Sequence, residues 1–402
     1  MSLANNVEFL RHFQKLSGFD ALGIYGRTAS QAGQSPLVEI NEFGTNPGAL
    51  KMFAYVPEQL PRAPALVVVL HGCGQTAAGY DVGTGWSTLA KRYGFVLMMA
   101  EQQGANNANA CFNWFSPGDV ARGRGEAASI RQMVARMVSD HKIDPRRIYI
   151  TGLSAGGAMT SVMLAVYPEV FSGGAIIAGL PFGIASNVRE ALGGMMQSTQ
   201  RPADKLGELV RKATKHKGPW PKVSVWHGSA DRTVNPGNAN EIVKQWLDVH
   251  GLPAAPMSVG DVDGHPREVW WNADGETVVE SYTIADMAHG TPLGLAGNDE
   301  PYGAEGAFLI EAGISSSYHI ADFFGLTGRV NPVTEAAKPV VSDVVRSAAT
   351  ESLQSSDIAA TLWSKTHKPV RQPKPVPHEP KRRGIDVGGV ITRALTAAGL
   401  MK

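Results

Sequence analysis

The stretch Gly152-Leu153-Ser154-Ala155-Gly156 reads G-x-S-x-G and lies between an apolar strand-like run at 147–151 and a helix-compatible run at 157–164. A serine between a strand and a helix must turn sharply. The flanking glycines are needed because a β-carbon there would collide with neighbouring backbone. This context favours a nucleophile elbow over the alternative, a glycine-rich turn with an incidental serine. The pattern predicts a serine oxygen that stands clear of a sheet, at the positive end of a helix.

Strand-like and helix-like segments alternate on both sides of this stretch. The strand candidates are 65–70, 95–99, 175–177 and 223–226, and the helix candidates are 86–93, 130–138 and 239–249. Such alternation predicts an α/β fold of the α/β-hydrolase type, with a mainly parallel central sheet flanked by helices. Two short strand candidates, 37–40 and 50–55, are joined by a Gly/Asn/Pro turn, so we expect antiparallel strands at one edge of the sheet.

The chain divides into three predicted parts. Residues 1–35 form an N-terminal lead-in, and residues 36–335 form the catalytic domain, in which 180–221 is a candidate cap insertion. Residues 336–402 combine a linker rich in Pro, Lys and Arg with a short C-terminal helix candidate at 387–395. A solvated tail is the alternative to a docking element for this last part.

Composition excludes several classes of protein. The chain has 402 residues with 43% hydrophobic and 18% charged, which suits one large globular domain with an appendage. The formal net charge of +1 gives no electrostatic case for a nucleic-acid partner. No apolar run approaches the roughly 20 residues of a transmembrane segment. Residues 1–8 lack the pattern of a secretory signal, so we expect a cytoplasmic location, with an extracellular one as the alternative if a leader was removed.

The chain contains two cysteines, Cys73 and Cys111, too few for a disulfide scaffold. In a reducing cytosol we expect free thiols. The alternative is one bridge, which would close a loop of about 40 residues and be worth roughly 3–4 kcal/mol.

Three residues fit the chemistry of a serine nucleophile. A serine hydroxyl needs a general base and an orienting acid, and with this elbow their chain order is Ser, then Asp or Glu, then His. Asp231 lies just beyond the strand candidate 223–226, and His289 lies in a loop after strand-like 278–283. We therefore assign Ser154 as nucleophile, His289 as general base and then acid, and Asp231 as the orienting carboxylate.

Other residues compete for these roles. His265 follows Asp263 and Gly264, which suggests a surface turn and a weaker candidate for the base. His227 precedes a glycine at a strand end and is interpreted as structural. Asp286 is only three residues from His289, a spacing that seldom lets a carboxylate orient an imidazole.

An oxyanion hole needs two amide donors. One is expected to be the amide of Ala155, and the other that of Cys73, in the small-residue loop 71–75. The Cys73 side chain is interpreted as a packed residue or half of a bridge, and His71 as a residue that shapes the loop. We expect no metal and no cofactor, because the sequence shows no closely spaced set of metal-ligating residues.

Several runs of sequence resemble those of polyhydroxybutyrate depolymerase-type esterases, α/β-hydrolases related to feruloyl and acetylxylan esterases. The runs are LHGCGQ at 70–75, CFNWF at 111–115, GLSAGGAM at 152–159, AGLPFG at 178–183 and GSADRTV at 228–234. The resemblance covers roughly residues 45–325. It implies the same three catalytic residues, and a hydrophobic cleft with Trp114 as a candidate for its wall.

The resemblance also implies a substrate class. We expect hydrolysis of carboxylic esters through an acyl-enzyme, on polyhydroxybutyrate-type polyester or its hydroxyalkanoate oligomers. The chain departs from many relatives in having Ile184 where they have a cysteine, and no familiar polymer-binding domain follows the catalytic region. Soluble oligomers or small esters are therefore favoured over crystalline polymer. The alternatives are a feruloyl or acetylxylan esterase, a serine peptidase, and a granule-binding protein that contacts a surface through its C-terminal tail.

Overall fold

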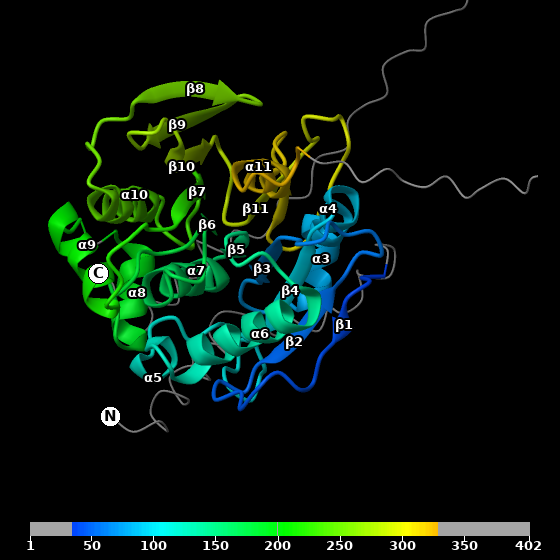
Figure 1. Cartoon of the computed structure of the whole chain (residues 1–402). Helices are drawn as coiled ribbons and strands as arrows, with labels where there is room; N and C mark the ends of the chain where they lie inside the picture. The colour runs from blue at the N-terminus through cyan, green and yellow to red at the C-terminus, as the bar shows by residue number, and fades with distance from the viewer. Residues whose placement is uncertain (1–33, 199, 329–402) are drawn as a thin grey trace, which may run out of the picture. The chain divides into compact units, whose positions relative to one another are not determined.

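The computed structural model describes residues 34–198 and 200–328. Its centre is a ten-stranded sheet with the order β1-β2-β4-β3-β5-β6-β7-β10-β9-β8 (Figure 1). The strands are β1 (Val38–Glu39), β2 (Lys51–Tyr55), β3 (Leu66–Leu70), β4 (Val96–Glu101), β5 (Ile148–Leu153), β6 (Gly173–Ile177), β7 (Lys222–Gly228), β8 (Ser258–Val262), β9 (His265–Trp271) and β10 (Thr277–Ile284). Two short strands, β11 (Thr291–Leu293) and β12 (Leu309–Glu311), form a separate parallel pair.

The central strands are parallel, as predicted. β4, β3, β5, β6, β7 and β10 all run in one direction. β3 reads LVVVL and is buried along its whole length, as expected for a strand covered on both faces. Leu70 pairs with Gly152, and Gly228 pairs with Ile284, so the carboxyl ends of these strands lie along one edge of the sheet. The loops that follow them therefore meet at that edge.

Antiparallel strands occur at both edges of the sheet, not only at one. The predicted hairpin is present, with β1 antiparallel to β2. At the other edge β9 is antiparallel to β10, and β8 is antiparallel to β9; neither pairing was predicted from the sequence. β8 reads SVGDV and is largely exposed, so it has none of the apolar alternation that signals a strand. The expectation for His265 was also wrong, because it begins β9 and is buried, while Asp263 and Gly264 form the turn.

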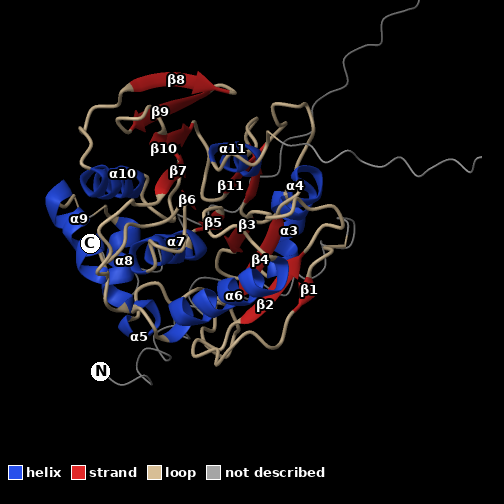
Figure 2. Ribbon diagram, viewed as in Figure 1, coloured by secondary structure: helices blue, strands red, loops and turns tan. Residues whose placement is uncertain are grey.

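Helices cover both faces of the sheet (Figure 2). They are α3 (Ala77–Thr84), α4 (Trp86–Tyr93), α5 (Pro117–Val120), α6 (Gly125–His141), α7 (Ala155–Val166), α8 (Val188–Met196), α9 (Ala203–Ala213), α10 (Gly237–His250) and α11 (Ser316–Phe323). Met133 of α6, Met159 of α7 and Trp246 of α10 share one hydrophobic core. Trp86 of α4 and Ile320 of α11 belong to a second core, on the other face. These are the two helical layers of an α/β sandwich.

The candidate cap insertion, 180–221, contains α8 and α9. α9 buries Leu206 and Val210 in the same core as α7 and α10. The segment thus extends a helical layer of the domain.

Several predictions concern residues outside those that the structure describes. They are the lead-in, whose first 33 residues are not described, and the linker and helix candidate in 336–402. In residues 34–198 and 200–328, no helix has the length and apolar character needed to cross a membrane.

The turn from β5 to α7 holds Ser154 in a strained backbone conformation. Its φ is 57° and its ψ is −116°, and its amide donates to the Ile177 carbonyl over 2.9 Å. A β-carbon on Gly156 would lie 2.3 Å from the Leu70 carbonyl oxygen, closer than such atoms approach. The first turn of α7 therefore passes directly against the end of β3, and glycine is required there.

We predict that Gly156→Ala destabilises the fold by about 1–3 kcal/mol, because the new methyl group meets backbone that cannot move aside. Gly193→Ala is the matched control, since a β-carbon at this helical glycine meets nothing within 4 Å. The control should stabilise α8 by about 0.5–1 kcal/mol. Urea unfolding of both variants measures the difference, and equal stabilities would contradict the packing argument.

Candidate active site

Three of the predicted residues meet at the carboxyl edge of the sheet. His289 Nε2 lies 2.9 Å from Ser154 Oγ, and His289 Nδ1 lies 2.7 Å from Asp231 Oδ2. Each comes from a different loop: Ser154 from the turn after β5, Asp231 from the turn after β7, and His289 from the loop after β10. All three are buried, with at most 9% of each residue exposed. The result is one hydrogen-bonded chain from hydroxyl to imidazole to carboxylate.

Asp231 receives hydrogen bonds on both oxygens. Its Oδ1 accepts from the amides of Thr233 and Val234, at 2.8 and 2.9 Å. Its Oδ2 accepts from His289 and also faces His227 Nε2 at 3.1 Å. Burial acts to raise the pKa of Asp231, but the hydrogen bonds from the two histidines outweigh it and hold the pKa well below its usual range. The carboxylate is therefore ionised at neutral pH.

The ionised carboxylate determines the tautomer of His289. Nδ1 must carry a proton to donate to Asp231. In the neutral ring Nε2 then holds a lone pair that faces the Ser154 hydroxyl. This is the arrangement in which an imidazole can take a proton from serine.

The two amides predicted to form an oxyanion hole belong to Ala155, at the start of α7, and to Cys73, in the loop 71–75. Ala155 is the first residue of α7, so its N–H has no acceptor within the helix. The amide of Gln75 donates to the Gly72 carbonyl over 3.3 Å and so closes a turn around Cys73 and Gly74, while the role of the Cys73 amide stays a prediction. The start of α7 abuts this loop, since a β-carbon on Gly156 would lie 2.5 Å from the His71 carbonyl oxygen.

His71 fixes the shape of the loop 71–75. It is fully buried, its Nδ1 donates to the Gly72 carbonyl over 2.7 Å, and its Nε2 accepts from the Gln102 amide at 3.1 Å. Burial lowers the pKa of His71 to about 4. The ring is therefore neutral at physiological pH, as its acceptor role at Nε2 requires.

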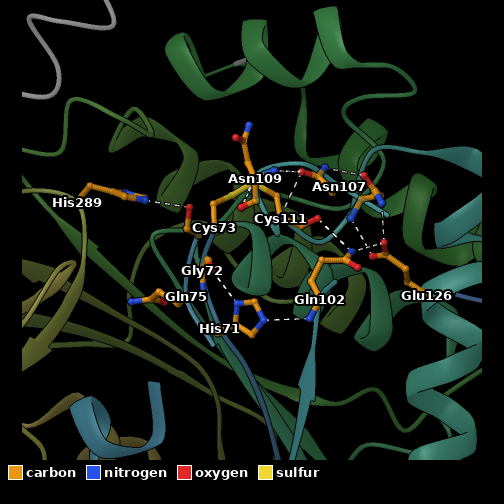
Figure 3. The surroundings of a disulfide bond; sticks show 12 residues. His71, Gly72, Cys73, Gln75, Gln102, Asn107, Asn109, Cys111, Glu126 and His289 are labelled. Atoms are coloured by element: carbon orange, nitrogen blue, oxygen red, sulfur yellow. Dashed lines mark hydrogen bonds between the residues drawn. A yellow bond between two sulfur atoms is a disulfide. The ribbon is translucent and has the colours of Figure 1, made fainter. Parts of the chain in front are cut away.

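A disulfide joins Cys73 to Cys111 (Figure 3). The expectation of free thiols was wrong, and the alternative of one bridge holds. The two Cα atoms are 4.3 Å apart although the cysteines are 38 residues apart in the chain, a proximity that spacing alone does not reveal. A loop of this length makes the bridge worth roughly 3–4 kcal/mol. The bond ties the loop 71–75 to the segment 102–113.

A buried glutamate, Glu126, binds both ends of the segment 102–113 through hydrogen bonds. Glu126 Oε1 accepts from the side-chain amides of Gln102 at 2.5 Å and Asn113 at 2.6 Å. Gln102 also donates to the Cys111 carbonyl over 3.1 Å, so the network reaches the disulfide (Figure 3). Burial, the largest influence, raises the pKa of Glu126 to about 7. Glu126 was not predicted from the sequence, because a glutamate in the first turn of a helix is common.

The competing residues lie outside the hydrogen-bonded chain. His265 Nε2 donates to the Ala312 carbonyl over 2.8 Å. Asp286 is exposed, and its amide donates to Ser229 Oγ over 2.9 Å.

Among the described residues, no three His, Cys, Asp or Glu side chains are grouped so that they could hold a metal ion.

Two aromatic residues are candidates for contact with the substrate. Trp114 is buried in the hydrophobic core and meets the Phe115 ring edge-on, so its place in a cleft wall stays a prediction. Phe308 was missed. Its partly exposed ring meets His289 edge-on at 5.8 Å between ring centroids, and its φ is 61°, unusual for a residue other than glycine. Such strain is often found at functional sites.

The strand that contains Leu309 holds Phe308 at the site. The Phe308 carbonyl accepts from the Thr291 amide at 2.8 Å. The neighbouring Ala307 carbonyl accepts from the Gln75 side chain at 3.2 Å, which links it to the loop 71–75. Phe308 lies in an irregular segment without periodicity, so the sequence offers no signal for it.

A serine at a strand-to-helix elbow, on the carboxyl edge of a mainly parallel sheet covered by helices, defines an α/β-hydrolase. The family model described as Esterase PHB depolymerase matches residues 51–263. The chain belongs to this family of esterases, as the sequence resemblance predicted.

Known relatives agree with this assignment. Poly(3-hydroxyalkanoate) depolymerase C of Paucimonas lemoignei is 46% identical over 293 residues, which cover 73% of this chain and 70% of the relative. An acetylxylan esterase of Coprinopsis cinerea is 31% identical over 275 residues, 66% of this chain and 72% of the relative. A solved structure, an acetyl xylan esterase from Aspergillus awamori, aligns with a TM-score of 0.61 at 23% identity, covering 73% of this chain and all of that one, and shows the same fold. The protein is a carboxylic ester hydrolase.

The raised pKa of Glu126 predicts a pH-dependent stability. Burial moves the pKa from 4.5 to about 7, so between these values the folded state holds a proton that the unfolded state has lost. Stability from this group is therefore present below pH 4.5 and falls as pH rises to 7, by about 3 kcal/mol.

Glu126→Gln should remove this fall. Urea unfolding from pH 4 to pH 8 would then show the stability of the wild type declining relative to the variant. A constant difference across this range would contradict the assignment.

Proposed function

We propose that this protein hydrolyses polyhydroxybutyrate-type esters, in particular hydroxyalkanoate oligomers, through an acyl-enzyme on Ser154. The observation that carries the proposal is the hydrogen-bonded chain of Ser154, His289 and Asp231, with its 2.9 Å link between hydroxyl and imidazole. The substrate class is supported by the 46% identity to a protein named poly(3-hydroxyalkanoate) depolymerase C.

The reaction proceeds in two halves. Ser154 Oγ attacks the ester carbonyl carbon while His289 Nε2 takes its proton, and the oxyanion accepts hydrogen bonds from the Cys73 and Ala155 amides, each worth roughly 3 kcal/mol. The bond to the alcohol oxygen then breaks, and His289 returns the proton to the leaving alcohol. Water, activated by His289, attacks the acyl-enzyme and releases the acid and free Ser154. Asp231 stabilises the imidazolium in both halves.

Turnover of an ester series tests the proposal. We expect hydrolysis of p-nitrophenyl esters from acetate to octanoate and of soluble 3-hydroxybutyrate oligomers, with kcat reduced on the order of 10⁴-fold or more by Ser154→Ala. The control Ser186→Ala, at an exposed serine, should retain wild-type activity.

The preferred substrate decides between the candidates. Methyl ferulate as the best substrate would favour a feruloyl esterase, and a p-nitroanilide would favour a peptidase. A folded wild type that turns over none of these compounds would overturn the proposal and favour a binding protein.

Phe308 is proposed as a wall of the acyl pocket, because its partly exposed ring lies beside His289. Phe308→Ala should raise KM for butyrate and longer esters by about fivefold to tenfold, the value of a lost apolar contact, while acetate changes less. Phe323→Ala is the matched control, since its ring packs on Phe324 of the α11 end instead. Steady-state kinetics across the series measure this, and a uniform KM change at all chain lengths would count against the assignment.

The disulfide bears on location. Bridges between cysteines persist in oxidising compartments, so the Cys73–Cys111 bond favours the extracellular alternative over the cytoplasm.

Contact of the tail 336–402 with a polyester surface is a further part of the proposal. Retention of Ser154→Ala protein on polyester granules, and its loss on deletion of 338–402, would support it.

A further inference from the structure

His227 occupies a position where an apolar residue is expected. Alternate residues of β7 face one side of the sheet, and Val223 and Val225 fill that side as members of the hydrophobic core. His227 follows them in the same row and is 3% exposed. A buried polar ring at the end of a valine row needs a hydrogen-bonding partner to be stable there.

The partners of His227 determine its protonation. Its Nε2 lies 3.1 Å from Asp231 Oδ2 and 3.0 Å from the Val234 carbonyl oxygen. Both atoms are acceptors, so Nε2 carries the proton. Within the part of the chain that the structure describes, the buried Nδ1 of His227 has no hydrogen-bond partner. The ring is thus held by one edge only, the edge that faces the carboxylate.

We propose that His227 is a positioning residue that shares Asp231 Oδ2 with His289 and thereby sets how strongly the carboxylate acts on the catalytic imidazole. The proposal rests on the proposed function, in which His289 is the general base. It assigns a catalytic consequence to a residue that the sequence suggests is structural.

A role limited to holding the turn does not explain this arrangement. The amides of Thr233 and Val234 bind Asp231 Oδ1 and close the turn, and the bond from His227 to the Val234 carbonyl would hold the turn without any contact to Asp231 Oδ2. An apolar side chain would continue the valine row and leave no orphaned nitrogen. A donor at this place supplies what an apolar side chain cannot: a second hydrogen bond to Asp231 Oδ2, the oxygen that His289 also uses.

The shared oxygen has an electrostatic consequence. A donor on Oδ2 draws negative charge away from the bond with His289, so the carboxylate stabilises the imidazolium less. The acidic limb of the activity profile then lies at lower pH than with a carboxylate that serves His289 alone. The titratable groups that face one another here are His227 from β7, Asp231 from the next turn and His289 from the loop after β10, while Arg232 and Asp286 are exposed.

Three substitutions separate donation from packing. His227→Leu keeps similar volume and removes the donor, His227→Gln keeps a donor near the position of Nε2, and His227→Asn is too short to reach Asp231. For Leu and Asn we expect kcat on p-nitrophenyl butyrate to fall about tenfold, because Asp231 loses one of the hydrogen bonds that hold it in position, with KM within twofold. The acidic limb of kcat/KM should move upward by about half a pH unit to one unit. His227→Gln should keep the acidic limb of kcat/KM at its wild-type pH and should keep most of kcat.

His250→Leu is the matched control for losing a partly buried histidine. His250 Nε2 bonds the Pro221 carbonyl at 3.0 Å, away from the catalytic residues, so this variant should lose stability without any movement of the pH profile. If the Leu variant fails to fold, the comparison of Gln with Asn decides. If the pH profiles of kcat/KM of all His227 variants superpose on that of the wild type, the inference about His227 is overturned and the proposed function stands. An inactive wild type would overturn the proposed function instead.

Discussion

The contact between the start of α7 and the end of β3 is the constraint on which the site depends. The backbone at Gly156 approaches the Leu70 and His71 carbonyls so closely that no side chain fits between them. This approach sets the strained conformation of Ser154, with a φ of 57°. It also brings the amide at the start of α7 beside the loop 71–75. One packing contact thus positions Ser154 and brings the start of α7, with its predicted oxyanion donor, against the loop 71–75.

Two buried polar networks hold the remaining parts of the site. On one side, Asp231 is bound through both oxygens, by backbone amides and by two imidazoles. On the other, His71, Gln102 and Glu126 form a continuous set of hydrogen bonds behind the disulfide. Each network is buried in low dielectric, where satisfied hydrogen bonds are strong and a missing partner is costly. The site is therefore rigid on both sides of the serine, as electrostatic preorganisation requires.

Sequence patterns predicted the parts of the fold that depend on local periodicity. The buried parallel strands, the helix at 86–93 and the hairpin at the β1 edge are all present. The second antiparallel edge was missed because β8 is exposed and polar, so burial does not impose a pattern on it. The position of His265 was misjudged because Asp263 and Gly264 indicate a turn but not the strand that follows it.

The sequence by itself determined the family through its motifs and the fold class through its alternating strands and helices. It also predicted that Ser154, Asp231 and His289 lie together, because each follows a strand whose carboxyl end must lie at one edge of a parallel sheet. Only the tertiary structure decided which distant side chains touch. It joined Cys73 to Cys111, placed Phe308 against His289, and brought His227 to the carboxylate of Asp231. The reason is physical: strand and helix periodicity are properties of neighbouring residues, whereas these contacts depend on loops whose paths are fixed by packing and buried hydrogen bonds.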